Sequence, residues 1–336
     1  MAALAAVFGC QSQSPSSASP AATTAQVFAP PLQAASLPVA RNAAELLELV
    51  RGLKLSGRVE LAPVSELSVP AVASPVLAPR AGLALWNELV RARPPVQFQP
   101  IIVSRETWAQ LLEQPPDERR AATTSDIDKA RTLTAAAFFA EREATLEKEW
   151  QDMDENSRIR HEPVSNWLAQ QRRSRDAMTE KDVTSAGTSR APNEPPAFQF
   201  PVMREQIERA LGTSRSGRQP LTPAYDDSVR VLVLSAPAAS LPAHLRFGGF
   251  NDCPEPDAQV VALSHWQEQY GARLVYVGSD TLELLVERPP RDLEAAKKLA
   301  WEQYLFCADI VDQGTNSIAA LGRELAGSPT WFFWWD

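Results

Sequence analysis

The stretch ARLVYVGSDTLELLVE, residues 272–287, decides the fold of the C-terminal part of the chain. It contains two short runs of aliphatic and β-branched residues, joined by Gly278, Ser279 and Asp280. Turn residues between two such runs are typical of a β-hairpin. A pair of prolines at 289–290 then stops the second run, because proline cannot continue a strand ladder. We therefore predict two antiparallel strands here.

The segments on either side of this hairpin predict an α+β fold. Upstream, RVLVLSA (230–236) is apolar on both faces, as a central strand should be, and residues 257–270 carry apolar positions at helical spacing. Downstream, Asp292 opens a second helix, SIAALGREL (317–325) adds a shorter one, and TWFFWWD (330–336) forms the last strand. The order β-α-β-β-α-α-β fits a ferredoxin-like sandwich with one extra helix, in which the last strand lies beside the first.

The terminal heptad is the most aromatic part of the chain. In a strand, Trp331, Phe333 and Trp335 share one face, and Phe332 and Trp334 share the other. One set can pack against the helices, and the other faces the open side of the sheet. Large aromatic side chains do not all stay wet on such a surface. We expect either the N-terminal part of the chain or a partner or ligand to cover them.

The 336 residues divide by composition into four parts. We predict a leader or tether over residues 1–40, a small α/β module over 41–115, charged helices and a Pro/Ser-rich linker over 116–227, and the α+β domain over 228–336. The 28 prolines against 14 glycines favour loops and linkers between modules over one compact domain.

The N-terminus MAALAAVFGC is followed by a Ser/Pro/Ala-rich tract. This pattern resembles the end of a bacterial lipoprotein signal, with lipidation at Cys10, although the apolar run is short and lacks a basic residue before it. The other interpretation is a disordered terminus with an unrelated cysteine. The first would place the protein at a bacterial envelope membrane, held only by the lipid, and the second in the cytoplasm.

Composition also argues against several classes of function. A net charge of −8 offers no basic surface for nucleic acid. Three distant cysteines form neither a disulfide framework nor a metal site by spacing, and we predict no metal and no cofactor. The motifs of serine hydrolases, zinc proteases, phosphate loops and dinucleotide-binding folds do not occur in the sequence.

One cluster of polar residues is a candidate site. In the predicted sandwich, Asn251, Asp252 and Cys253 lie near a second group from the following helix, Cys307, Asp309, Asp312 and Gln313. Gly248 and Gly249 beside them allow close approach of backbone or ligand. His244 can reach the cluster as a base for Cys253. The alternatives are that Asn251 and Asp252 cap a helix, that Cys307 is a small core residue, or that Cys253 and Cys307 form a disulfide.

Several separated motifs carry a family resemblance. They are GGFNDCP (248–254), HWQEQYGARLV (265–275), LELLVERPP (282–290), AWEQYLFCADIVDQG (300–314) and the final WFFWWD. In this order they resemble the bacterial domain-of-unknown-function family 4253 over about residues 228–336. The resemblance implies no mechanism.

We therefore hypothesise a non-enzymatic protein-interaction module, in an accessory or toxin-neutralising role, with a protein partner. Binding would use Asn251, Asp252, Gly248 and Gly249, or the terminal residues Trp331, Trp334 and Trp335. The alternative is an enzyme or ligand-binding domain that uses Cys253, His244, Asp309 and Asp312.

Overall fold

The structure is a computed structural model, and it describes residues 37–53, 55, 60–92, 96–113, 115–160, 165–184 and 228–336. The predicted lipidation site Cys10 and most of the predicted tether and linker lie outside these residues. Among the residues described, no helix is long and apolar enough to cross a lipid bilayer.

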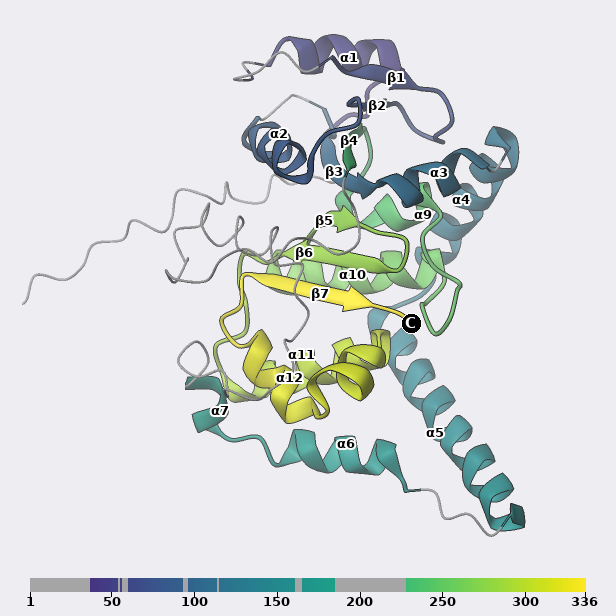
Figure 1. Ribbon diagram of the computed structural model, residues 1–336, viewed down its shortest axis with the longest axis vertical. Helices are drawn as coiled ribbons and strands as arrows, with labels where there is room; N and C mark the ends of the chain where they lie inside the picture. The colour runs from purple at the N-terminus through teal and green to yellow at the C-terminus, as the bar shows by residue number, and fades with distance from the viewer. Residues whose placement is uncertain are drawn as a thin grey trace, which may run out of the picture.

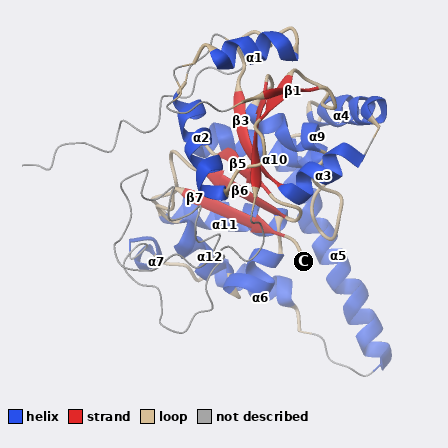
Figure 2. Ribbon diagram, turned by 45° about the horizontal axis from the view of Figure 1, so that its top comes forward, coloured by secondary structure: helices blue, strands red, loops and turns tan. Residues whose placement is uncertain are grey.

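One mixed sheet forms the centre of the molecule (Figures 1 and 2). Its strands are β1 (Ala62–Val64), β2 (Ala71–Ala73), β3 (Gln99–Ser104), β4 (Val229–Leu234), β5 (Arg273–Val277), β6 (Thr281–Leu285) and β7 (Thr330–Trp334). They lie in the order β1-β2-β4-β3-β5-β6-β7. The β3–β5 pair is parallel and the other pairs are antiparallel. The predicted α+β class is confirmed.

The hairpin lies where the sequence predicts it. In the β5–β6 pair, Arg273 opposes Leu285 and Val277 opposes Leu282, with a register shift between Leu274 and Tyr276. The Gly278 N–H donates to the Thr281 carbonyl over 2.8 Å and closes the turn. The apolar run near residue 230 becomes β4, which is buried at every position except Arg230 and has a strand on each side.

The ferredoxin-like arrangement is not confirmed, because the strand order differs from it. The last strand β7 pairs with β6, with Phe333 opposite Leu282, and does not lie beside β4. The N-terminal strand β3 lies between β4 and β5 instead, where Ile101 opposes Leu232 and Ile102 opposes Tyr276. The QPIIVS sequence of β3 is apolar on both faces, so it can fill an interior position of the sheet.

Helices cover both faces of the sheet (Figure 1). One face packs against α1 (Ala43–Arg51) and α2 (Pro79–Arg91), and the other face packs against helices that follow β3. The helices that follow β3 are α3 (Arg105–Glu113), α4 (Pro116–Ala130), α5 (Ala135–Arg160), α6 (Trp167–Asp176), α7 (Glu180–Thr184), η2 (Ala238–Ser240), α9 (Leu241–Leu245), α10 (Pro256–Tyr270), α11 (Leu293–Phe306), the π-helical η3 (Ile310–Thr315) and α12 (Ile318–Leu325). Of these, α7 packs against α11 and α12.

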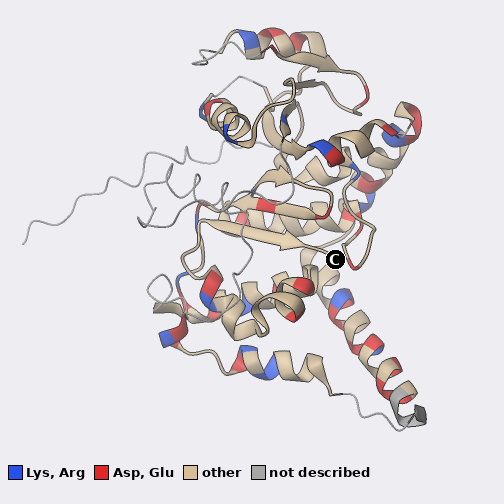
Figure 3. Cartoon of the chain, viewed as in Figure 1, with Lys and Arg blue, Asp and Glu red and all other residues tan. Residues whose placement is uncertain are grey.

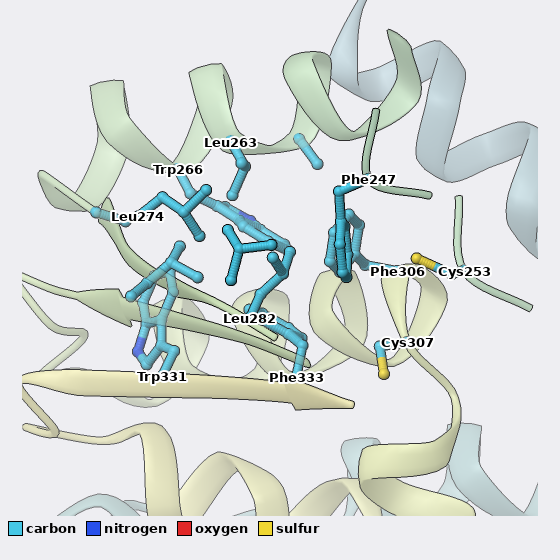
Figure 4. Packing of buried hydrophobic residues seen from close by; sticks show 14 of the residues in the cluster. Phe247, Cys253, Leu263, Trp266, Leu274, Leu282, Phe306, Cys307, Trp331 and Phe333 are labelled. Carbon is cyan, nitrogen blue, oxygen red and sulfur yellow. The ribbon is translucent and has the colours of Figure 1, made fainter. Parts of the chain in front are cut away.

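The terminal strand supplies the centre of the larger core. Trp331, Phe333 and Trp335 are each no more than 2% exposed, and Phe333 stacks on Trp266 of α10 with ring centroids 5.4 Å apart. Figure 4 shows this cluster with Phe306 beside it. Phe332 and Trp334 are half-buried. The predicted alternation of the heptad is therefore confirmed, and its first set of aromatic side chains is core.

Helix α5, which belongs to the charged helical region predicted between residues 116 and 227, is held against the C-terminal helices by its first turns. Phe138, Phe139 and Leu146 of α5 are buried in the larger core, and Arg142 Nε donates to the Leu305 carbonyl over 3.1 Å. The remainder of α5 extends away from the body of the molecule (Figures 1 and 2). Helix α5 is therefore anchored at one end.

Candidate functional site

The loop before α10 is built from left-handed backbone. Arg246, Gly248, Gly249 and Asn251 have φ values of 55°, 125°, 76° and 42°. A Cβ on Gly248 would lie 2.2 Å from the carbonyl oxygen of Pro254, so only glycine fits there. The close approach predicted at this glycine is thus made by the chain itself.

A buried glutamine holds this loop closed. The Gln259 Nε2 group donates to the carbonyls of Phe247 and Pro254, each over 3.0 Å, and to the sulfur of Cys253 over 3.4 Å. The Gly249 N–H donates to the Cys253 carbonyl over 3.2 Å. These bonds fix the loop from inside, and they leave Asn251 and Asp252 exposed. Neither of those two residues is the N-cap of α10, which is Glu255.

The two cysteines lie in the same region of the core, and both are free thiols (Figure 4). Cys253 is 5% exposed and Cys307 is 0% exposed. Burial raises the pKa of both thiols well above the usual value, and the nearness of Cys307 raises the pKa of Cys253 further. The thiolate is the nucleophilic form of cysteine, so both side chains are poor nucleophiles at neutral pH.

The candidate base His244 is engaged elsewhere. Its ring is buried, and Nδ1 lies 2.8 Å from the hydroxyl oxygen of Ser68. Burial lowers the pKa of His244 to about 4, so the imidazole is neutral at pH 7. His244 is therefore hydrogen-bonded to Ser68, in the segment before β2.

Asp309 and Asp312 lie at the π-helical turn η3. Asp309 accepts hydrogen bonds from Gln313 Nε2 at 3.0 Å and from the main-chain N–H of Asp336 at 3.1 Å. Asp312 accepts a long hydrogen bond of 3.5 Å from the Tyr304 hydroxyl. Burial, with the charge of Asp309 second, raises the pKa of Asp312 to about 6. Single π-helical turns frequently occur at functional sites, which makes Asp312 the titratable group to follow here.

Asp252 has charged neighbours that the sequence did not suggest. Its carboxylate lies 4.0 Å from Arg142 Nη2 of α5. Partial burial raises the pKa of Glu149, the Asp252 carboxylate raises it further, and Arg142 opposes the shift. Both α5 residues precede Asp252 by about 100 positions. The alternating charges of α5 were visible in the sequence, but they did not indicate which loop this helix would contact.

The outer edge of β7 is occupied by side chains of the same domain. The Pro329 carbonyl and the Trp335 N–H bond toward β6, so the main-chain groups of Thr330 and Trp334 point away from it. Ser328 Oγ donates to the Thr330 carbonyl over 2.8 Å, and the Cys307 thiol donates to the Trp334 carbonyl over 2.9 Å. Side chains that satisfy an edge in this way protect it from pairing with another strand.

The predicted residues therefore separate into two sets. Cys253, Cys307, Trp331 and Trp335 are buried, which favours a role in packing, and Asn251, Asp252 and Asp309 lie nearer the surface. Within the described ranges, no group of three or more His, Cys, Asp and Glu side chains is placed to hold a metal ion.

Comparison with known proteins identifies a domain but no activity. Residues 231–336 match a family model described as Domain of unknown function (DUF4253). No curated protein and no solved structure gives a significant match to the chain. The matched segment begins in β4 and reaches the C-terminus, so it leaves out β1, β2 and β3 of the shared sheet.

Proposed function

We propose, from the chemistry of the cluster, that this chain is a non-enzymatic protein-interaction module. Its C-terminal domain serves as the folded body, and its biological role is that of an accessory or neutralising factor for a partner protein. The observation that carries the proposal is that Cys253, Cys307 and His244, the groups that a thiol mechanism would need, are all buried and hydrogen-bonded inside the protein.

Three residues make this point. Catalysis by cysteine needs a thiolate and a base within hydrogen-bond reach. The Cys307 thiol donates a hydrogen bond to the Trp334 carbonyl, and Cys253 is buried with a raised pKa. His244 is neutral and hydrogen-bonded to Ser68. These groups stabilise the domain, which supports a function that depends on its surface.

The second candidate is an enzyme or small-ligand-binding domain centred on Asp312. A carboxyl group with a pKa of about 6 can give and take protons near neutral pH, as a general acid or base does. Asp309, one turn away, would then hold the ligand or keep the pKa of Asp312 raised.

Capture of bound molecules separates the two functions. The tagged full-length chain would be cross-linked in the cells that make it and purified, and the retained proteins and small molecules identified by mass spectrometry. The wild type would be compared with Asp312→Asn and Cys253→Ser, and with Asp128→Asn as a matched control, since Asp128 is an exposed carboxylate of α4. Thermal melting would confirm that each variant is folded.

We expect one set of partner proteins, retained equally by all four chains. A small molecule that the wild type retains and Asp312→Asn loses, without any protein partner, would overturn the proposal in favour of the second candidate.

A further inference from the structure

Helix α5 has two halves with different surroundings. The half up to Leu146 is anchored in the larger core, as described above. From Glu147 to Asn156 no side chain is buried in the described structure, and Met153 is 44% exposed. A helix of 26 residues is about 39 Å long at 1.5 Å per residue, so the outer half is a substantial arm.

The boundary between the two halves of α5 already binds a basic helix. Arg172 of α6 lies between two carboxylates of α5, with Nη2 at 2.8 Å from Glu143 Oε1 and Nη1 at 2.7 Å from Glu147 Oε2. Helix α6 carries two further arginines, Arg173 and Arg175, and the guanidinium of Arg175 lies over the ring of Trp301. This contact within the chain is therefore one example of how a basic helix binds to α5.

The outer half repeats the features that make this contact. Leu146, Trp150 and Met153 follow one another at intervals of four and three residues, so the apolar stripe continues past the point where the core ends. Between residues 147 and 156 there are five carboxylates and one lysine. In Figure 3 the positions of acidic residues, in red, recur along this arm. The arm thus presents an apolar stripe flanked by negative charge.

The base of the arm carries a charge conflict. Partial burial raises the pKa of Glu149, the Asp252 carboxylate raises it further, and Arg142, 4.0 Å from Asp252, acts in the opposite direction. A second cation placed between the two carboxylates would relieve the repulsion, as Arg172 does between Glu143 and Glu147. Asp252 belongs to the matched domain, so the surface joins that domain to α5.

We propose that the outer half of α5, residues 147–156, together with Asp252, docks a basic amphipathic helix of a partner protein. The apolar side of that helix covers Trp150 and Met153, and its arginines or lysines meet Glu149, Asp252 and the acidic flank. This inference rests on the proposed function and assigns it a surface and a class of partner. Charge complementarity of this kind speeds association and excludes acidic partners. For the same reason the surface disfavours nucleic acid and anionic lipid.

Synthetic helices test the proposal directly. The probes are an amphipathic peptide with a leucine stripe and lysine and arginine flanks, and a matched peptide with glutamate in the flanks. Binding to the full-length chain would be measured by fluorescence anisotropy at two salt concentrations, and the contact mapped by hydrogen exchange. Four variants are compared: Met153→Ser, the pair Trp150→Ser with Met153→Ser, the pair Asp152→Lys with Glu155→Lys, and Leu112→Ser. Leu112 of α3 is the control because it is also 44% exposed.

We expect the basic peptide to bind at least about tenfold more tightly than the acidic one, with weaker binding in high salt. Protection should be confined to residues 147–156 and the loop around Asp252. Met153→Ser and the serine pair should weaken binding, the lysine pair should reverse the preference between peptides, and Leu112→Ser should change nothing. Equal binding of the two peptides, or equal binding of the basic peptide to the wild type and the serine pair, would overturn the proposal.

The two proposals can fail separately. If the serine pair still captures the natural partner proteins in cells, the docking surface is wrong and the interaction function stands. If the wild type captures no partner protein, the interaction function itself fails.

Discussion

The thiol of Cys307 donates a hydrogen bond of 2.9 Å to the main-chain carbonyl of Trp334. Cys307 follows the last residue of α11 and is completely buried, and Trp334 is the last residue of the edge strand β7. A cysteine that the sequence marks as a candidate for chemistry therefore closes the end of a sheet.

Cys307→Ala should destabilise the protein by about 1–3 kcal/mol. The substitution removes a donor from a carbonyl and leaves a small void in a buried position. Cys307→Ser keeps a donor and should cost less than alanine. Urea unfolding measures both changes. If alanine and serine have the same effect, the hydrogen bond contributes nothing and only the volume of the sulfur matters.

Phe333→Ala should cost about 3–5 kcal/mol, as loss of a fully buried aromatic ring does. Phe332→Ala, one residue away on the other face of β7, should cost less than half as much because Phe332 is half-buried. Guanidinium unfolding of the two variants provides the comparison. Similar losses would contradict the assignment of the two faces.

Gly248→Ala should destabilise the loop before α10 by more than about 2 kcal/mol. The new Cβ would meet the Pro254 carbonyl oxygen at 2.2 Å, in addition to the strain of a positive φ. Gly327 is the matched control, since it has a φ of 69° and no atom within 4 Å of a Cβ placed on it. Gly327→Ala should therefore cost only about 1–2 kcal/mol. Thermal unfolding that ranks Gly327→Ala as the worse variant would exclude a packed loop.

Two titratable groups, His244 and Asp312, should act in opposite directions between pH 6.5 and 4. His244 has its pKa lowered from 6.5 to about 4, so the unfolded state binds the proton more readily and stability is lost as the pH falls. Asp312 has its pKa raised from 3.8 to about 6, so the folded state binds the proton more readily and stability is gained over the same interval.

The Asp312→Asn variant separates these effects. It should be more stable than the wild type at pH 7.5, and its stability should fall more steeply from pH 6 to pH 4, because the opposing gain is gone. His244→Gln should show the reverse. Its stability should fall less than that of the wild type as the pH is lowered, or should rise. Urea midpoints between pH 4 and 7.5 measure both slopes. An Asp312→Asn profile parallel to the wild type would show that this carboxyl has an ordinary pKa.

Local pattern was sufficient to predict the elements and faces of the C-terminal domain. The turn at Gly278 and the alternation of Trp331 to Trp335 are properties of a few adjacent residues, and both appear in the structure as expected. Strand order is a different kind of information. An apolar sequence indicates that both faces of a strand are buried, but it does not indicate which strands lie on either side of it. The position of β3 beside β4 was therefore not predicted.

The sequence predicted that residues of the candidate site lie close together, but it did not predict the chemical state of their side chains. Cys253 does lie near Cys307, as the sequence suggested. A core position for Cys307 was one of the interpretations of the sequence. The sequence did not reveal that Cys253 is buried, that His244 contacts Ser68, or that Arg142 approaches Asp252. Each of these facts depends on elements more than 100 residues away in the chain or on the packing of the finished core.

The place of β3 has a consequence for how this chain can be divided. The segment recognised as a family, residues 231–336, contains β4 and β5, but the strand that joins them comes from residues 99–104. Excised at the family boundary, it would carry two interior strands with nothing between them. The segment that matches the family model is therefore shorter than the segment needed to form the sheet. A graft of this segment into another protein should include residues 99–104, and during synthesis the sheet can be completed only after residues 330–334 have been made.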